Sequence, residues 1–176
     1  MPTDTVYGIG ADPFVPGATA GIFAAKRRPE GVLLPVLVDS VAQAEQVAVV
    51  DARARLLIDR FWPGGLTVVM RRQPGLTLEL GEDADTVAVR CPDHAVPRQL
   101  CAAVGPLAVT SANLHGEPTP PTADGVAVLF GAAVAVVVDG GRCEGAPSTV
   151  VDCTKTQVTL RRQGRVPWSA VQEVAG

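Results

Sequence analysis

The chain has 176 residues, of which 47% are hydrophobic, 19% are charged and 4% are aromatic, and its formal net charge is −3 at pH 7. This composition excludes a disordered chain and an overall basic signature of nucleic-acid binding, although a local basic patch remains open. The longest apolar run, residues 126–138, contains Gly131 and is shorter than the roughly 18 residues of a membrane-spanning helix. We therefore expect one cytoplasmic domain over residues 1–176, without a membrane segment.

Hydrophobic spacing and turn residues predict short helices and strands along the whole chain. Pro29 ends the first expected helix, and Asp39 or Ser40 can cap the second. Because helices and strands alternate without a strict repeat, we expect an α/β fold with a twisted mixed sheet flanked by helices. The expected helices are 17–26, 40–47, 51–61, 97–104 and 122–130, and the expected strands are 33–38, 66–71, 86–91, 106–110, 134–138, 149–152 and 158–162.

Several familiar catalytic and metal-binding motifs are absent from the sequence. It has no phosphate-binding Gly-x-x-x-x-Gly-Lys loop, no Gly-x-Gly-x-x-Gly fingerprint and no Gly-x-Ser-x-Gly elbow, and only two histidines are available for a catalytic triad. The cysteines form no Cys-x-x-Cys pair, so we predict buried free thiols in a reducing compartment and no metal site on the protein. They are Cys91, Cys101, Cys143 and Cys153.

Polar residues cluster instead at the ends of the apolar strands, where ligands gather in open α/β sheets. Their cations and hydroxyls suit a polyanionic ligand, because arginine offers forked hydrogen bonds and lysine a point charge. Each cluster also has a plainer interpretation: a capped turn, a helix-dipole partner, an ordinary loop or a surface charge. The clusters are Thr3-Asp4-Thr5 with Tyr7, Lys26 with Arg28, Arg90, Thr110 to Asn113, Ser148-Thr149, and Arg162.

Together the clusters resemble the Sua5/YrdC/YciO family, in family order over nearly the whole chain. The most specific blocks are Pro-Thr-Asp-Thr-Val-Tyr-Gly and Ser-Thr-Val-Val-Asp. The resemblance implies a twisted sheet around a concave, positively lined ligand cavity. The segments that carry it are 2–10, Lys26 to Pro29, Phe61 to Thr67, Thr86 to Arg90, Thr110 to Asn113 and Pro147 to Asp152.

The resemblance also implies an activity, that of an L-threonylcarbamoyladenylate synthase, which is a nucleotidyltransferase. In this reaction the amine of L-threonine takes up bicarbonate or carbon dioxide, and the resulting carbamate attacks the α-phosphate of ATP. Pyrophosphate leaves, and a separate threonylcarbamoyl transferase passes the product to adenosine 37 of tRNA. Mg²⁺ is expected to accompany ATP, and positioning with electrostatics should supply most of the catalysis.

The same resemblance assigns roles to individual residues. Three cations, Lys26, Arg28 and Arg90, are the expected catalytic residues. L-Threonine is expected to contact Thr5, Arg90, Ser111 and Ser148. ATP is expected to contact Lys26, Arg28, Thr86, Asn113 and Arg162.

Three departures from the family pattern bear on these expectations. A helix and a strand normally precede the Pro-Thr-Asp-Thr block, whereas Met1 stands directly before it here, so we expect an unpaired sheet edge and an exposed apolar face. Val32 and Leu33 replace the usual polar residue and proline, which predicts the loss of one nucleotide contact. His115 replaces a serine after Ser-Ala-Asn, and it can still donate a hydrogen bond.

Two alternative functions stay open from the sequence. One is a relative that makes a carbamoyl-adenylate for another acceptor. The other is an inactive paralogue that binds tRNA or double-stranded RNA, against which the net charge of −3 argues mildly.

Overall fold

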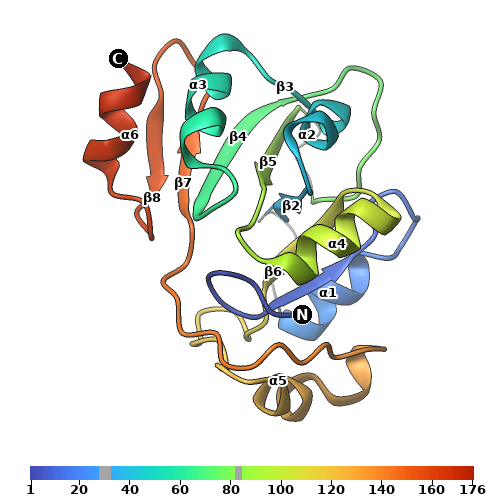
Figure 1. The fold of residues 1–176 in the computed structure, drawn as a ribbon. Helices are drawn as coiled ribbons and strands as arrows, with labels where there is room; N and C mark the ends of the chain where they lie inside the picture. The colour runs from blue at the N-terminus through green and yellow to red at the C-terminus, as the bar shows by residue number, and fades with distance from the viewer. Residues whose placement is uncertain (28–32, 82–84) are drawn as a thin grey trace.

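The computed structural model describes residues 1–27, 33–81 and 85–176, and it shows one mixed sheet with helices packed against it. Figure 1 shows α3 and α6 together beside one end of the sheet, α2 and α4 farther along it, and α5 apart at the bottom. The helices are α1 (Ala20–Lys26), α2 (Val41–Val47), α3 (Ala52–Phe61), α4 (Ala95–Val104), α5 (Ala123–Phe130), η1 (Gly131–Ala133) and α6 (Trp168–Ala175). The strands are β1 (Gly8–Ala11), β2 (Val36–Leu37), β3 (Ala48–Val49), β4 (Leu66–Arg72), β5 (Thr86–Arg90), β6 (Leu107–Ser111), β7 (Thr149–Asp152) and β8 (Thr159–Arg162).

The strand order is β1-β6-β2-β5-β4-β7-β8, with β3 paired to β4 beside this path. The pairs β2–β5 and β4–β7 are parallel and the other pairs are antiparallel, which confirms the expected mixed sheet. Valines of the central strands and apolar residues of α3 form the middle of the core. Val68, Val89, Val151, Leu57 and Ile58 are all fully buried there.

Side-chain caps begin two of the predicted helices, α2 and α3. The Ser40 hydroxyl accepts a hydrogen bond from the Gln43 amide at 3.3 Å at the start of α2. The Asp51 carboxylate accepts from the Arg53 and Ala54 amides at 3.1 and 2.8 Å and begins α3. Such caps satisfy amides that have no partner inside the helix, so these starts are local properties of the chain.

The predicted strand 134–138 is wrong. These residues follow η1 without regular secondary structure, and Val136 is 76% exposed. A run of branched residues favours a strand only where a neighbouring strand offers backbone partners, and the register of this sheet offers none there. The sequence interpretation also missed β1, β3 and α6, and the expected strand 33–38 is reduced to β2.

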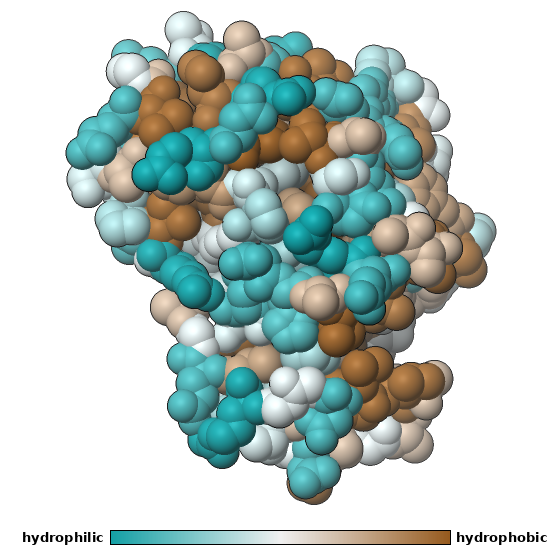
Figure 2. Space-filling view, in the orientation of Figure 1, coloured by the Kyte–Doolittle hydropathy of each residue, from teal (hydrophilic) through white to brown (hydrophobic). Residues whose placement is uncertain are grey.

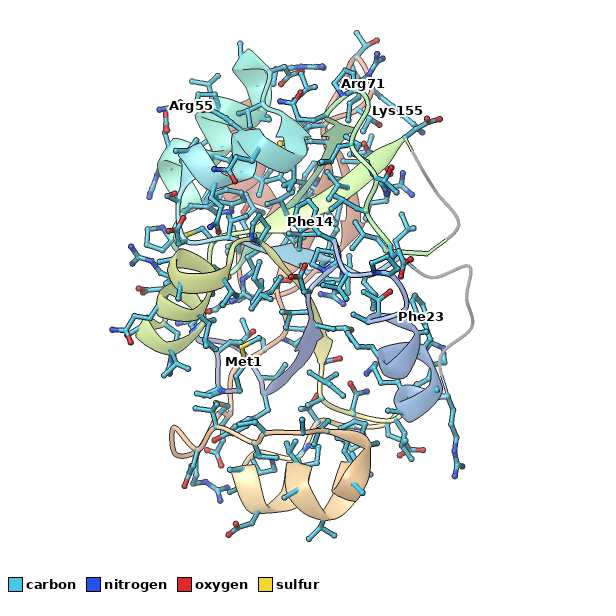
Figure 3. The ribbon with its side chains drawn as sticks, turned by 90° about the vertical axis from the view of Figure 1, so that its right-hand side faces the viewer. Met1, Phe14, Phe23, Arg55, Arg71 and Lys155 are labelled. Carbon is cyan, nitrogen blue, oxygen red and sulfur yellow. The ribbon has the colours of Figure 1, made fainter. Side chains whose placement is uncertain are left out.

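β1 forms one edge of the sheet, where it pairs with β6. The backbone amide of Gly8 donates to the Met1 carbonyl at 2.8 Å, and Figure 3 shows Met1 beside β1. An apolar groove of about 490 Å³ runs along this strand and is also lined by Ile22, Val126 and residues 133–138. Figure 2 shows a hydrophobic patch at the lower right, where Figure 1 places the N-terminus and the segment after α5.

Among the residues that the structure describes, no helix has the length and apolar character needed to cross a bilayer.

Candidate functional site

A polar cavity of about 250 Å³ lies where the ends of several strands meet the loop that precedes β1. It collects predicted residues from distant parts of the chain, because β4, β5 and β7 are neighbours in the sheet although they are far apart in sequence. The predicted residues that line it are Thr5, Arg90, Ser111, Ser148 and Arg162.

The loop before β1 is held by its own hydroxyls. Thr3 Oγ1 accepts from the Thr5 amide at 3.1 Å, donates to the Val6 carbonyl at 2.6 Å, and lies 3.0 Å from Thr5 Oγ1. The Thr-Asp-Thr block is therefore a hydroxyl-stabilised turn, as the plainer interpretation had it, and it also places Thr5 in the cavity wall. A local turn and a ligand contact are compatible in this block.

Arg90 ends β5 and its guanidinium is held on three sides. Its Nε donates to the Gly64 carbonyl at 2.9 Å, its Nη1 donates to Thr5 Oγ1 at 2.9 Å, and its Nη2 pairs with the Asp4 carboxylate. The side chains of Arg90 and Asp4 are each only 7% exposed, so the alternative of a surface charge at Arg90 is wrong. Burial lowers the pKa of Arg90 and the Asp4 carboxylate opposes that change, so the arginine stays charged and oriented.

Arg162, from β8, supplies the cavity with a cation that no carboxylate compensates. Its Nε and Nη2 donate to the Ser148 carbonyl at 3.2 and 2.9 Å, and Nη2 also reaches Ser148 Oγ at 3.2 Å. Within the described ranges Arg162 forms no ion pair. Partial burial lowers the pKa of Arg162, without bringing an arginine near neutrality at physiological pH. Arg162 therefore adds uncompensated positive charge to the cavity lining.

Lys26 lies beneath the cavity wall and outside its lining. The residue is 1% exposed, and its ammonium donates to the Ser111 carbonyl at 2.5 Å, to the Asn113 carbonyl at 2.5 Å and to Asn113 Oδ1 at 3.1 Å. Ser111 Oγ donates to the same Asn113 Oδ1 at 2.5 Å. Lys26 thus fixes the turn that carries Ser111 and Asn113, and a direct contact of Lys26 or Asn113 with ATP stays a prediction.

Thr86 is a described predicted residue that is not part of the cavity lining. Thr86 begins β5 at the end opposite Arg90, although strand alternation puts its side chain on the same face as Ala88 and Arg90. Arg28 and Val32 lie outside the described residues, so their predicted effects on ATP stay predictions. Leu33 itself lines the cavity.

The sequence interpretation assigned no role to two polar residues of the site. Asp4 orients Arg90, and the buried Thr67 lies 2.8 Å from Ser148 across the two hydroxyl oxygens. Asp4 lies in the segment 2–10 and Thr67 in the segment Phe61 to Thr67, and both segments carry the family resemblance. A polar side chain within such a segment was the signal that the sequence offered for a role in the site. Their partners are 86 and 81 residues away in sequence, which local patterns cannot reveal.

No cluster of three or more metal-binding side chains occurs in the described part of the chain. The four cysteines are free and buried, which confirms the predicted free thiols. Burial raises the pKa of Cys91 to about 11 and those of Cys101 and Cys153 to about 12, so these thiols are protonated and unreactive at neutral pH.

Comparison with known proteins finds the same family over most of the chain. The family model Sua5_yciO_yrdC, described as telomere recombination, matches residues 1–164. The chain is 42% identical over 178 residues to a protein of Mycobacterium leprae, an alignment that covers 100% of this chain and 81% of that protein. It is 37% identical over 179 residues to the threonylcarbamoyl-AMP synthase of Pyrococcus abyssi, of which it covers 53%.

The solved structures agree with the sequence comparison. The structure of Pyrococcus abyssi Sua5 complexed with L-threonine matches with a TM-score of 0.89 at 37% identity, over 99% of this chain and 52% of that chain. The chain thus spans about half the length of that archaeal protein. Escherichia coli YciO matches with a TM-score of 0.83 at 24% identity over 94% of this chain and 82% of that chain, which shows a common fold.

Proposed function

The chain belongs to the Sua5/YciO/YrdC family, and on this premise we propose that it is a threonylcarbamoyl-AMP synthase. The observation that carries the proposal is the convergence of Thr5, Arg90, Ser111, Ser148 and Arg162 on one cavity at the strand ends. These are residues that the family resemblance assigns to threonine and ATP. The relative from Pyrococcus abyssi was solved with L-threonine, which supports an amino acid as one ligand of this cavity.

The proposed reaction forms two bonds. The neutral threonine amine attacks the carbon of carbon dioxide, one C=O π bond opens onto its oxygen, and the nitrogen loses a proton, which gives a carbamate. When bicarbonate is the substrate, its C–OH bond breaks and the hydroxyl leaves as water with the amine proton. A carbamate oxygen then attacks the α-phosphorus of ATP, the bond from that phosphorus to the oxygen bridging to the β-phosphate breaks, and pyrophosphate leaves with the electron pair. Both partners are anions, so the protein must lower their repulsion and align them.

The two arginines of the cavity divide this task. Arg90 is neutralised by Asp4 and held rigidly, so it serves as a fixed fork of hydrogen-bond donors for the threonine carboxylate or carbamate. Arg162 has no compensating carboxylate within the described residues and supplies net positive charge to the phosphates. Such pre-oriented donors stabilise charge that develops in a transition state, which is the main need of this chemistry.

Mg²⁺ accompanies ATP in this proposal. In the described ranges no group of carboxylates, histidines or thiols could hold it alone, so the phosphate oxygens of the nucleotide would supply its ligands. The ion would neutralise phosphate charge, while the residues of the cavity bind and orient both substrates.

The proposal places the protein in the cytoplasm, upstream of a threonylcarbamoyl transferase that modifies tRNA. Four unpaired buried thiols support a reducing compartment. Direct binding of tRNA or double-stranded RNA is a separate property, to be measured with the same sample.

Pyrophosphate release from ATP by the purified chain tests the proposal. We expect release that requires both L-threonine and bicarbonate, together with a threonylcarbamoyl-AMP product detected by mass spectrometry. Release with bicarbonate alone, or with another amino acid in preference to threonine, would contradict the proposed substrate. A folded, monodisperse chain that releases no pyrophosphate but binds RNA with a steep salt dependence would favour the RNA-binding paralogue.

A further inference from the structure

The buried hydroxyls of Thr67 and Ser148 form part of the cavity wall, and Thr67 has no role in the mechanism described above. Thr67 Oγ1, on β4, lies 2.8 Å from Ser148 Oγ, immediately before β7. The two residues are 3% and 7% exposed, and both line the cavity. Parallel pairing of β4 with β7, in which Leu66 lies opposite Thr149, holds the two backbones in place.

The donors and acceptors of this pair can be counted. Each hydroxyl carries one proton, and the contact between the two oxygens uses one of them. Arg162 Nη2 donates to Ser148 Oγ at 3.2 Å and so occupies an acceptor position of the serine. Thr67 Oγ1 has no further hydrogen-bond partner in the described part of the chain. One hydroxyl proton is therefore left over at the cavity wall, next to a cation.

We propose that Thr67 is a positioning residue for the amino-acid substrate. Its hydroxyl donates to Ser148 Oγ, so that the Ser148 proton points into the cavity and donates to an anionic oxygen of the bound amino acid, its carboxylate or its carbamate. Arg162 reinforces the donor by polarising the same oxygen. The inference rests on the proposed function and adds to it a residue that determines threonine affinity.

A purely structural role would not need a hydroxyl at this position. Thr67 stands on a buried strand between Leu66 and Val68, where valine has nearly the same shape and a similar strand preference. Among the described residues, the hydrogen bond of its side chain is to Ser148 alone. The hydroxyl is thus needed by the function of Ser148 and not by the packing of β4.

The test compares Thr67→Val with Thr67→Ser, and uses Thr19→Val as a matched control. Thr19 is another buried threonine, 3% exposed, and lies outside the cavity. We expect Thr67→Val to raise the KM for L-threonine about tenfold while the KM for ATP changes less than about twofold, because one directed hydrogen bond is lost. Thr67→Ser restores the threonine KM, and Thr19→Val leaves both values unchanged.

Calorimetric titration of each variant with L-threonine gives a second measurement that needs no turnover. A double-mutant cycle adds the third: Thr67→Val combined with Ser148→Ala is expected to be no worse than Ser148→Ala alone, since Thr67 acts through Ser148.

A normal threonine KM in a folded Thr67→Val variant would overturn the inference. Equal losses in Thr67→Val and Thr67→Ser would also overturn it, because the hydroxyl would then not be the cause. Additive losses in the double variant would show that Thr67 acts independently of Ser148. Failure of the wild-type chain to bind L-threonine would instead overturn the proposed function itself, so the two failures are distinguishable.

Discussion

The polar cavity at the strand ends and the apolar groove along β1 differ in chemistry more than in size. The groove is the larger of the two, at about 490 Å³ against 250 Å³. Its lining is apolar, with side chains such as Ile9, Ile22 and Val126. The cavity instead has Arg90, Arg162 and a set of hydroxyls, most of them already hydrogen-bonded to the protein.

This comparison shows why volume alone does not identify a site. The joining of two anions needs oriented donors and uncompensated positive charge, and only the cavity has them. The groove offers apolar surface, whose removal from water contributes stability without directing a ligand. Substitutions in the two regions should therefore separate catalysis from stability.

The largest effect is expected from Arg90→Ala. Its removal leaves the buried Asp4 carboxylate with Arg165, 3.8 Å away and half exposed, as its remaining ion-pair partner among the described residues. We therefore expect a loss of about 3–5 kcal/mol in the free energy of unfolding together with the loss of activity. Urea denaturation and pyrophosphate release measure the two effects. Arg71→Ala, on the exposed side of β4, is the control and should change stability by less than about 0.5 kcal/mol. Unchanged stability in Arg90→Ala would refute the structural pair with Asp4.

The variant Ile22→Ala sharpens the comparison from the side of the groove. Ile22 is 3% exposed and lies in α1, so its truncation should lower the free energy of unfolding by about 2–4 kcal/mol. At a temperature where the variant is folded, its KM for L-threonine should stay within about twofold of the wild type, because the Ile22 side chain has no hydrogen-bond donor and lies outside the polar cavity. A large threonine KM effect with normal stability would reverse the assignment of the two regions.

Arg162→Gln should produce the opposite result, a loss of activity with little loss of stability. We expect turnover to fall about 100-fold, which is typical when one pre-oriented donor to a transition-state anion is removed. Thermal unfolding should shift little, because Arg162 lies on the exposed edge strand β8 and its loss leaves no buried carboxylate unpaired among the described residues. The control is Arg161→Gln on the same strand, whose guanidinium pairs with Asp152 outside the cavity. Equal activity losses in both variants would argue against a specific role of Arg162.

The smallest effect is expected from Val136→Thr, which introduces a hydroxyl at the rim of the groove. Val136 is 76% exposed, so the free energy of unfolding should change by less than about 0.5 kcal/mol, and the activity should be normal. Denaturation and steady-state kinetics measure both. A larger destabilisation would show that this rim is packed more tightly than its exposure indicates.

The sequence alone determined the helices with local caps, most of the strands, and the order of the motif blocks. Ser40 and Asp51 begin their helices through hydrogen bonds to amides two or three residues ahead, and such contacts are readable from neighbouring letters. The motif blocks likewise indicated the family, because each is a continuous segment. The run 134–138 shows the limit of this information, since its strand preference finds no partner in the sheet.

The tertiary structure alone decided which polar groups meet and which charges remain uncompensated. Asp4 forms an ion pair with Arg90, 86 residues away in sequence, and Ser148 hydrogen-bonds to Thr67, 81 residues away. The Lys26 ammonium donates to the backbone carbonyls of Ser111 and Asn113 and does not point into the cavity. The physical reason is that strand order in the sheet brings these residues together, and strand order depends on the packing of the whole core. Arg90 and Arg162 are the same amino acid in the sequence, and only their neighbours make one a rigid donor and the other a free positive charge.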